Sequence, residues 1–445
     1  MAVAWKSSAK SPTKHIATEG GAGAPPGKER TAKLRKDRTP LRSIAKYAFI
    51  IPMTKTISRR RCLQVLIALL SLVAAGRAQN SSVKESSVNY FLYVGTYTAK
   101  ESKGIYAYRF NAKSGELTPM GLAAETKNPL FIAIDPTNRF LYAVNEIADY
   151  KGVSSGAISA FSINRQTGKL TLLNQVASRG ADPCYISFDK SGKYVLVANY
   201  TGGNVAVFPL QPDGRIGEAT AFIQHTGSSV NKERQEAPHA HWIETTADNR
   251  FAVAVDLGLD ELLVYHFGAK TGALAANSPP YAKLDAGAGP RHLAFDPNGK
   301  FAYVVNELQS SITAFSYDST QGTFQKLKTV STLPKDFSGK NDTAEIEVHP
   351  SGKFLFASNR GHDSIAVFSV DGQTGELISV GDYSTQGKVP RSFTIDPTGE
   401  FLYVANQDTN NIVSFRIDAA SGRLTPTNQN VNVPEPVCLK FMRAD

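Results

Sequence analysis

Arginine, histidine and carboxylate side chains recur at the two ends of one repeated phrase, where their chemistry suits the binding of a small anion. The clearest copy, GPRHLAFDPNGKFAYVVNE, has Arg291 and His292 near its start and Glu307 at its end. A guanidinium offers a planar fork to a carboxylate or phosphate, and a carboxylate or imidazole can deprotonate water. The full set of candidate residues is His239, Asp256, Arg291, His292, Glu307, Glu345, Arg360 and Arg391.

The phrase that carries these residues returns along the chain. Copies begin at positions 129, 183, 290, 343 and 390, and a looser copy at 238 is interpreted as having two extra residues in its turn. Each copy contains two β-rich runs joined by an Asp-Pro-x-Gly-type turn, followed by a third run and a fourth, weaker strand. Four strands in about 50 residues are typical of a β-propeller blade.

The two ends of the repeated region complete each other. PVCLKF, which begins at position 436, supplies a first strand, whereas YFLYVGTYT at 90–98 is a second strand without a first. We therefore predict an all-β, seven-bladed propeller with four strands per blade, in which the C-terminal strand joins the N-terminal blade and closes the ring. A tandem of open β-sandwiches is the alternative, but it would not need one end to donate a strand to the other.

Propeller geometry explains why the candidate residues occur only at the ends of the phrase. The first strand of each blade lines the central channel and the second runs antiparallel to it, so the start of the first and the end of the second share one face. Long loops at 224–238, 333–342 and 147–156 belong to the same face, as binding loops usually do. The sequence thus predicts a functional site at one mouth of the channel, with a ring of structural ion pairs as the alternative.

The first 89 residues have a different organisation. Residues 1–52 are polar and basic, which predicts a disordered extension or sequence upstream of the true start. Residues 53–78 combine a basic start, a short apolar run and small residues, as in an export signal, and SRRRCLQ within them resembles the twin-arginine signal. With a linker at 79–89, the propeller would occupy 90–445. The signal predicts a periplasmic or secreted protein, or a cytoplasmic one if the segment is not used.

Charge and motif content argue against several classes of protein. Residues 1–78 hold 16 of the 49 Lys and Arg residues but 3 of the 39 Asp and Glu residues, so the remaining chain is near −3 and nucleic-acid binding is not expected. The apolar run is shorter than a membrane span of about 20 residues, so no stable insertion is expected after signal cleavage. No zinc, EF-hand or nucleophile-elbow motif occurs, and we expect no metal, no cofactor and a monomer. Cys184 and Cys438 are expected to be packed thiols.

Five segments taken together resemble the propeller-type lactonase family, namely PHAHW, VDLGLDE, GAGPRHLAFDPNGKFAYVVNEL, SNRGHDSIAVFSV and VPRSFTIDPTGEFLYVANQ. This family includes bacterial 6-phosphogluconolactonases and is similar in fold to the fungal cis,cis-muconate lactonising enzyme. The resemblance covers roughly 90–445. It implies metal-independent hydrolysis of a sugar lactone, here 6-phospho-D-glucono-1,5-lactone to 6-phosphogluconate. The residues proposed as functional in the fold would fall on His239, Arg291, Glu307 and Arg391.

The resemblance also suggests roles for these residues. Arg291 and Arg391 would hold the anionic group and the developing oxyanion, and either Glu307 or His239 would act as general base on water. The remaining candidates, Asp256, His292, Glu345 and Arg360, are expected to bind substrate. An unphosphorylated lactone is a further candidate substrate because the chain carries an export-like segment. Two other functions stay open: a non-enzymatic exported propeller that binds a sugar acid, peptide or glycan, and a lactonising isomerase of muconate type.

Overall fold

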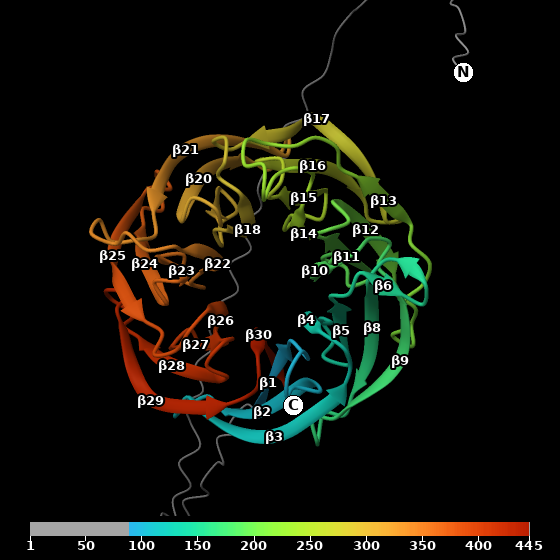
Figure 1. Cartoon of the computed structure of the whole chain (residues 1–445), viewed down its shortest axis with the longest axis horizontal. Helices are drawn as coiled ribbons and strands as arrows, with labels where there is room; N and C mark the ends of the chain where they lie inside the picture. The colour runs from blue at the N-terminus through green and yellow to red at the C-terminus, as the bar shows by residue number, and fades with distance from the viewer. Residues whose placement is uncertain (1–88, 445) are drawn as a thin grey trace, which may run out of the picture. The chain divides into compact units, whose positions relative to one another are not determined.

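The computed structural model describes residues 89–444, and every regular element in this range is a β-strand. Seven antiparallel four-stranded sheets stand as blades around a central axis (Figure 1). The predicted all-β, seven-bladed propeller with four strands per blade is therefore confirmed. The extension, export signal and linker predicted at 1–52, 53–78 and 79–89 lie outside the described residues, apart from Asn89.

The strands of the first three blades run outward from the axis in chain order. Blade 1 contains β4 (Pro129–Ile134), β5 (Phe140–Asn145), β8 (Ala157–Ile163) and β9 (Leu170–Ala177), with a small hairpin of β6 (Asp149–Tyr150) and β7 (Val153–Ser154) in its loop. Blade 2 contains β10 (Pro183–Phe188), β11 (Tyr194–Asn199), β12 (Asn204–Pro209) and β13 (Ala221–Gln224). Blade 3 contains β14 (Ala240–Thr245), β15 (Phe251–Asp256), β16 (Glu261–Gly268) and β17 (Ala273–Lys283).

The next three blades follow the same order. Blade 4 contains β18 (Pro290–Phe295), β19 (Phe301–Asn306), β20 (Ser311–Asp318) and β21 (Thr323–Ser331). Blade 5 contains β22 (Asp342–Val348), β23 (Phe354–Arg360), β24 (Ser364–Val370) and β25 (Leu377–Ser384). Blade 6 contains β26 (Pro390–Ile395), β27 (Phe401–Asn406), β28 (Asn411–Ile417) and β29 (Leu424–Asn432).

Blade 7 is built from both ends of the described chain. Its inner strand is β30 (Pro436–Arg443), which pairs antiparallel with β1 (Asn89–Thr96), and β2 (Gly104–Asn111) and β3 (Glu116–Glu125) complete the sheet. The β1–β30 register runs from Tyr90 opposite Arg443 to Thr96 opposite Pro436. The predicted closure of the ring by the C-terminal strand is confirmed, and it covers the edge of β1 that faces the axis.

Each inner strand contains a β-bulge close to its start. In blade 4, Pro290 pairs with Asn306 and His292 pairs with Val305, so Arg291 is the extra residue. A bulge releases one side chain from the alternation of the strand and changes its direction. Across the seven blades, the bulged positions hold Leu130, Cys184, His241, Arg291, Ala344 with Glu345, Arg391, and Val437.

The register of blade 3 corrects the alignment expected from sequence. Ala240 pairs with Asp256 as Pro290 pairs with Asn306, so Ala240 occupies the position that proline has in most other blades. The turn of this copy therefore has no extra residues. His241, and not His239, occupies the position equivalent to Arg291.

A glycine in the turn between the third and fourth strands joins each blade to the preceding one. These glycines are Gly115, Gly168, Gly214, Gly272, Gly322, Gly375 and Gly422, and all have positive φ. In six of the seven, an added Cβ would meet the aromatic ring that begins the second strand of the preceding blade, as Gly422 would meet Phe354 at 2.5 Å. In four joints a tyrosine hydroxyl also donates to the glycine carbonyl, as Tyr142 does to Gly214 at 2.7 Å.

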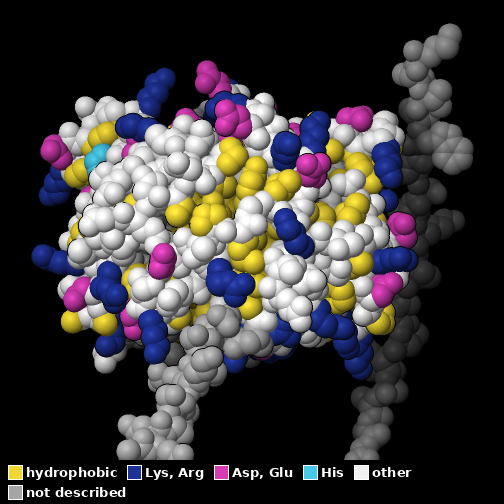
Figure 2. All heavy atoms as spheres, turned by 90° about the horizontal axis from the view of Figure 1, so that it is seen from below, with side chains coloured by type: hydrophobic (Ala, Val, Ile, Leu, Met, Phe, Trp, Pro, Cys, Tyr) yellow, Lys and Arg dark blue, Asp and Glu magenta, His cyan; other side chains and the backbone are white. Residues whose placement is uncertain are grey.

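The surface seen in Figure 2 has basic and acidic side chains interspersed among apolar ones. Such mixing agrees with the nearly balanced charge of the chain after residue 78. Within residues 89–444, no helix is long and apolar enough to cross a membrane.

We expect Gly422→Ala to destabilise the fold by about 3 kcal/mol. The new methyl group would occupy a left-handed conformation, at a cost of about 1–2 kcal/mol, and would overlap the Phe354 ring, which adds a similar amount. Gly299→Ala is a control for conformation alone, because Gly299 has φ of +66° and no atom within 4 Å of an added Cβ. Gly372→Ala, with neither feature, should change stability by less than about 0.5 kcal/mol. Equal urea midpoints for all three variants would contradict the role of this joint.

Candidate active site

A cavity of about 260 Å³ opens at the mouth of the ring where the first strands begin and the second strands end. Its lining residues are Tyr97, Glu146, Cys184, Tyr200, Arg234, His241, Glu307, Arg360 and Arg391. We call this space the arginine-lined cavity. All of these residues lie at the start of an inner strand, just after or at the end of a second strand, or, for Arg234, on the loop at 224–238. This is the face that the sequence predicted for the functional site.

Glu307 holds the arginines of this cavity together. Its Oε1 is 2.5 Å from Nη2 of Arg234, and its Oε2 is 2.8 Å from Nη2 of Arg360. Nε of Arg291 lies 3.2 Å from the same Oε2, but its N–H is not aligned for a hydrogen bond. Three guanidinium groups therefore share one buried carboxylate, which reduces their mutual repulsion.

The ionisation of Glu307 follows from these neighbours. Burial by itself would raise the pKa of Glu307, but the charges of Arg360, Arg291 and other basic groups lower it well below its ordinary value. The carboxylate is consequently ionised at neutral pH and is a weak proton acceptor. Such a group is better suited to positioning arginines than to deprotonating water.

Arg391 differs from the other arginines of the cavity. Within the described chain its guanidinium makes no ion pair, and its carbon Cζ lies 5.5 Å from the centroid of the Tyr97 ring. Burial tends to lower the pKa of Arg391, but the nearby Tyr97 and Glu146 raise it overall. The site thus offers one charged guanidinium whose donors are free for a ligand.

Arg291 is buried and is not among the residues that line the cavity. Its side chain is 4% exposed, and its Nη1 donates to the carbonyl of Ala344 at 2.7 Å. Burial, with the like charges of Arg360 and Arg391, lowers the pKa of Arg291 to about 10, so the group stays charged at neutral pH. Arg291 therefore stabilises the charge of the Glu307 carboxylate without contacting the cavity itself.

Glu146 is the second carboxylate of the cavity, and unlike Glu307 it has no arginine in ion-pair contact within residues 89–444. Its oxygens lie 3.1 and 3.3 Å from the Tyr97 hydroxyl, and no ion pair holds it within the described residues. Burial raises the pKa of Glu146, although the charge of Arg391 opposes the shift. A carboxylate with a raised pKa is a better proton acceptor near neutral pH.

The two histidines of PHAHW take different places. His241 lines the cavity, and burial together with Arg291 and His292 lowers its pKa well below the ordinary value, so the imidazole is neutral. His239 lies behind Tyr200, with their rings stacked at 4.5 Å, and its Nδ1 is 3.1 Å from the Tyr200 carbonyl oxygen. The structure therefore brings His241, and not His239, to the cavity.

Three other predicted substrate-binding residues do not line this cavity. Asp256 is fully buried and accepts hydrogen bonds from Nδ1 of His225 at 2.6 Å and from the backbone N–H of His239. His292 lies deeper along the axis, where its Nδ1 is 2.8 Å from Oε1 of Glu345. Arg360, the fourth residue of that set, does line the cavity.

Sequence reasoning missed Glu146, His241 and Arg234, as well as the uncharged lining residues Tyr97, Cys184 and Tyr200. Glu146 occupies the same position after its second strand as Glu307 does, so the repeat contained the signal for it. Arg234 had only the length of its loop as a signal. Cys184 and Cys438 are buried free cysteines, as predicted, and burial raises the pKa of the Cys184 thiol well above its ordinary value.

Comparison with known proteins agrees with this architecture. The family model described as "Lactonase, 7-bladed beta-propeller" matches residues 91–441, and the chain belongs to this family. The chain is 41% identical over 354 residues to the 6-phosphogluconolactonase of Bacillus subtilis, an alignment that covers 79% of this chain and 98% of that protein. It is 34% identical to the solved periplasmic gluconolactonase of Pseudomonas aeruginosa, with a TM-score of 0.76 and coverage of 80% and 100%.

We expect Glu307→Gln to destabilise the protein by about 3 kcal/mol at neutral pH, because it leaves buried guanidinium groups without their shared anion. Since the pKa of Glu307 is lowered in the folded state, this stabilisation is present above the ordinary carboxyl pKa and is lost as the pH falls toward the lowered one. Urea denaturation at pH 7 and pH 4 measures both effects.

Glu376→Gln is the matched control for this substitution. Glu376 pairs with Lys328 at 2.6 Å on the surface, where both side chains are about half exposed. Its loss should cost less than about 1 kcal/mol at either pH. Equal stabilities of the two variants would show that Glu307 is not the centre of the arginine cluster.

Proposed function

We propose that this protein is a lactonase that hydrolyses 6-phospho-D-glucono-1,5-lactone to 6-phosphogluconate. The observation that carries the proposal is the arginine-lined cavity, in which the guanidinium of Arg391 has no ion pair in the described chain. A phosphorylated lactone supplies an anion for arginines, and its reaction develops a second negative charge on the carbonyl oxygen. The relatives named above as a 6-phosphogluconolactonase and a gluconolactonase support this class of substrate.

The arginines divide between two tasks in this proposal. Arg234, with a side chain 37% exposed, and Arg360, at 14%, lie nearer the opening and bind the phosphate through the N–H groups that Glu307 does not use. Arg391 binds the lactone carbonyl. Glu307 holds Arg234 and Arg360 in place, and Arg291 stabilises the Glu307 carboxylate. We therefore propose Arg291 and Glu307 as positioning residues, and Glu307 is not the general base.

Glu146 is the proposed general base. It accepts a proton from water as the water oxygen bonds to the lactone carbonyl carbon, and Arg391 stabilises the resulting oxyanion. When the intermediate collapses, the bond between the carbonyl carbon and the ring oxygen breaks, and the ring oxygen takes the proton from Glu146. The product is an open-chain acid, which ionises in water. Neutral His241 offers a hydrogen-bond acceptor or donor to the reacting water in the same cavity.

The cellular location and domain boundaries belong to the proposal as well. We propose that residues 53–78 direct export and that residues 90–445 form the catalytic domain, for which the periplasmic relative gives support. In that compartment an unphosphorylated glucono-1,5-lactone is an alternative substrate. Monomeric state and the absence of nucleic-acid binding stay predictions.

We expect Arg391→Ala to lower kcat/KM for 6-phosphogluconolactone by about 100-fold or more, because it removes a charged donor to the oxyanion. Acid release by the full-length protein, corrected for spontaneous hydrolysis, measures the rate. Arg416→Ala is the control, since Arg416 pairs with Glu400 on the surface and its side chain is 53% exposed. If neither this lactone nor glucono-1,5-lactone is hydrolysed faster than in buffer, the lactonase proposal fails.

We expect Glu146→Gln to lower kcat by about 100-fold while KM changes little, because the amide cannot accept the proton from water. In the unsubstituted protein kcat should fall as the pH drops below the pKa of Glu146, which lies above the ordinary carboxyl value. The variant should lose this acid limb. If Glu146→Gln has the same kcat as the unsubstituted protein, or if its kcat still falls at acidic pH in the same way, another group is the general base.

A further inference from the structure

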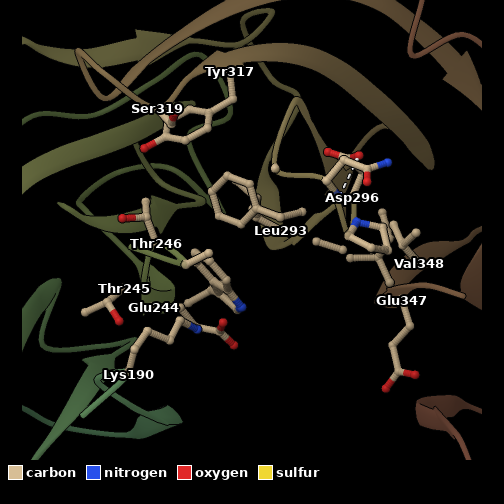
Figure 3. Close-up of a pocket in the computed structure, with 18 of the residues that line it drawn as sticks. Lys190, Glu244, Thr245, Thr246, Leu293, Asp296, Tyr317, Ser319, Glu347 and Val348 are labelled. Carbon is tan, nitrogen blue, oxygen red and sulfur yellow. Dashed lines mark hydrogen bonds between the residues drawn. The ribbon is translucent and has the colours of Figure 1, made fainter. Parts of the chain in front are cut away.

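A second cavity opens at the other mouth of the ring, on the face of the Asp-Pro-x-Gly-type turns (Figure 3). Its volume is about 580 Å³, and an adjoining lobe of about 370 Å³ shares part of its lining. The residues that line both spaces are Phe131, Tyr185, Lys190, Glu244 and Lys440. We call the two together the turn-face cavity.

Lys440, on the ring-closing strand β30, has an ammonium group without a polar partner in the described chain. Its Nζ lies 4.7 Å from the centroid of the Phe131 ring, and no carboxylate is within ion-pair distance. Burial tends to lower the pKa of Lys440, but Glu345, Glu347 and other groups raise it overall, so the side chain is charged. An ammonium group that makes no hydrogen bond to the protein can donate to a ligand oxygen in the cavity.

Two carboxylates of the turn-face cavity can accept further hydrogen bonds, because each carboxylate has about four acceptor sites. Glu347 accepts the backbone N–H of Ile395 at 2.9 Å through Oε2, and Glu244 accepts the Tyr185 hydroxyl at 2.6 Å through Oε1. The Thr394 side chain also hydrogen-bonds to Glu347, but neither carboxylate makes an ion pair within residues 89–444, and Figure 3 shows both side chains extending into the open space. The cavity thus presents acceptors as well as donors.

The other charged groups of the lining are already engaged. Asp296 accepts the backbone N–H groups of its own turn, Asp248 pairs with Arg250, and Glu345 is bound to His292. The groups left for a ligand are the carboxylates Glu244 and Glu347 and the ammonium groups Lys190 and Lys440. Burial raises the pKa of Glu347 to about 7, so these four groups together carry a net charge between zero and +1 near neutral pH. So small a charge favours a neutral ligand over a phosphorylated or other multiply charged one.

Aromatic side chains form part of the same lining. Tyr185, Trp242, Phe295 and Tyr317 border the cavity, and the covered hydroxyl of Tyr317 has no hydrogen-bond partner in the described chain. Aromatic rings accept flat apolar surface, such as the C–H faces of a pyranose ring. Sugar hydroxyls both donate and accept hydrogen bonds, so they can satisfy carboxylates and ammonium groups at once.

We propose that the turn-face cavity binds a neutral monosaccharide, at a site separate from the arginine-lined cavity. The buried pair of His292 and Glu345 lies between the two spaces, with Glu345 lining the turn-face cavity and Nε2 of His292 lying 3.4 Å from Nη1 of Arg291. The two cavities share no lining residue. This site does not depend on the proposed lactonase activity.

Tryptophan fluorescence can test this site directly. The chain has two tryptophans, Trp5 and Trp242, and Trp242 borders the turn-face cavity. In a full-length Trp5→Phe protein, emission therefore reports on this cavity alone. D-Glucose, D-galactose and D-mannose are titrated to about 50 mM, well above a millimolar dissociation constant.

We expect a saturable change in emission with at least one of the three hexoses. Lys440→Met should raise the dissociation constant by about 10-fold, and Glu347→Gln gives the same test through the carboxylate if Lys440→Met does not fold. Lys328→Met, a surface control, and Arg391→Ala, in the other cavity, should leave hexose binding unchanged.

Three results would overturn the proposal. They are the absence of a response to all three hexoses, binding that is lost in Arg391→Ala but kept in Lys440→Met, and a saturable response to gluconate or methylammonium without one to hexoses. Lactone hydrolysis is measured on the same preparations. Loss of sugar binding with hydrolysis retained would count against this site alone, and the reverse result would count against the lactonase proposal alone.

Discussion

The pairing of β30 with β1 is the constraint on which both cavities depend, because it closes the ring that fixes the inner strands relative to one another. Each cavity also takes a residue from this one joint. Tyr97, next to the end of β1, faces Arg391 across the boundary between blades 7 and 6, and Lys440 of β30 enters the turn-face cavity. Opening the ring would therefore displace lining residues of both cavities as well as exposing the edge of β1.

The two carboxylates of the arginine-lined cavity differ in the number of arginines that they contact. Glu307 is committed to three arginines and remains ionised, whereas Glu146 is buried beside a tyrosine hydroxyl and its pKa is raised. Two carboxyl groups of the same cavity thus have pKa values shifted in opposite directions by their surroundings. The guanidinium of Arg391 has no carboxylate partner in the described chain, so no ion pair balances its charge.

The repeat made the fold predictable, because runs, turns and an aromatic residue return in each blade for reasons of packing. In six of the seven blades, the aromatic residue that begins the second strand, such as Phe354, has the turn glycine of the next blade against it. The site was harder to predict. The sequence alignment of blade 3 started from Pro238, but in the structure Ala240 occupies the position that proline has in most other blades. The alignment was therefore displaced by two residues, and it selected His239 instead of His241. Asp256 forms a buried pair with His225, which no local pattern indicates, and the inward course of the Arg234 loop has no sequence periodicity.

Because of the bulge near the start of each inner strand, the side chain at that position can vary without a change in the backbone pairing of the blade. Backbone pairing resumes in the same register after the extra residue, whether that residue is Leu130, Cys184 or Arg391. Mutation at these positions can therefore change the chemistry at the mouth of the ring without altering the hydrogen bonds of any blade. Three of these positions, Cys184, His241 and Arg391, line the arginine-lined cavity, so a lineage can exchange their side chains and acquire new substrate preferences while the scaffold is retained.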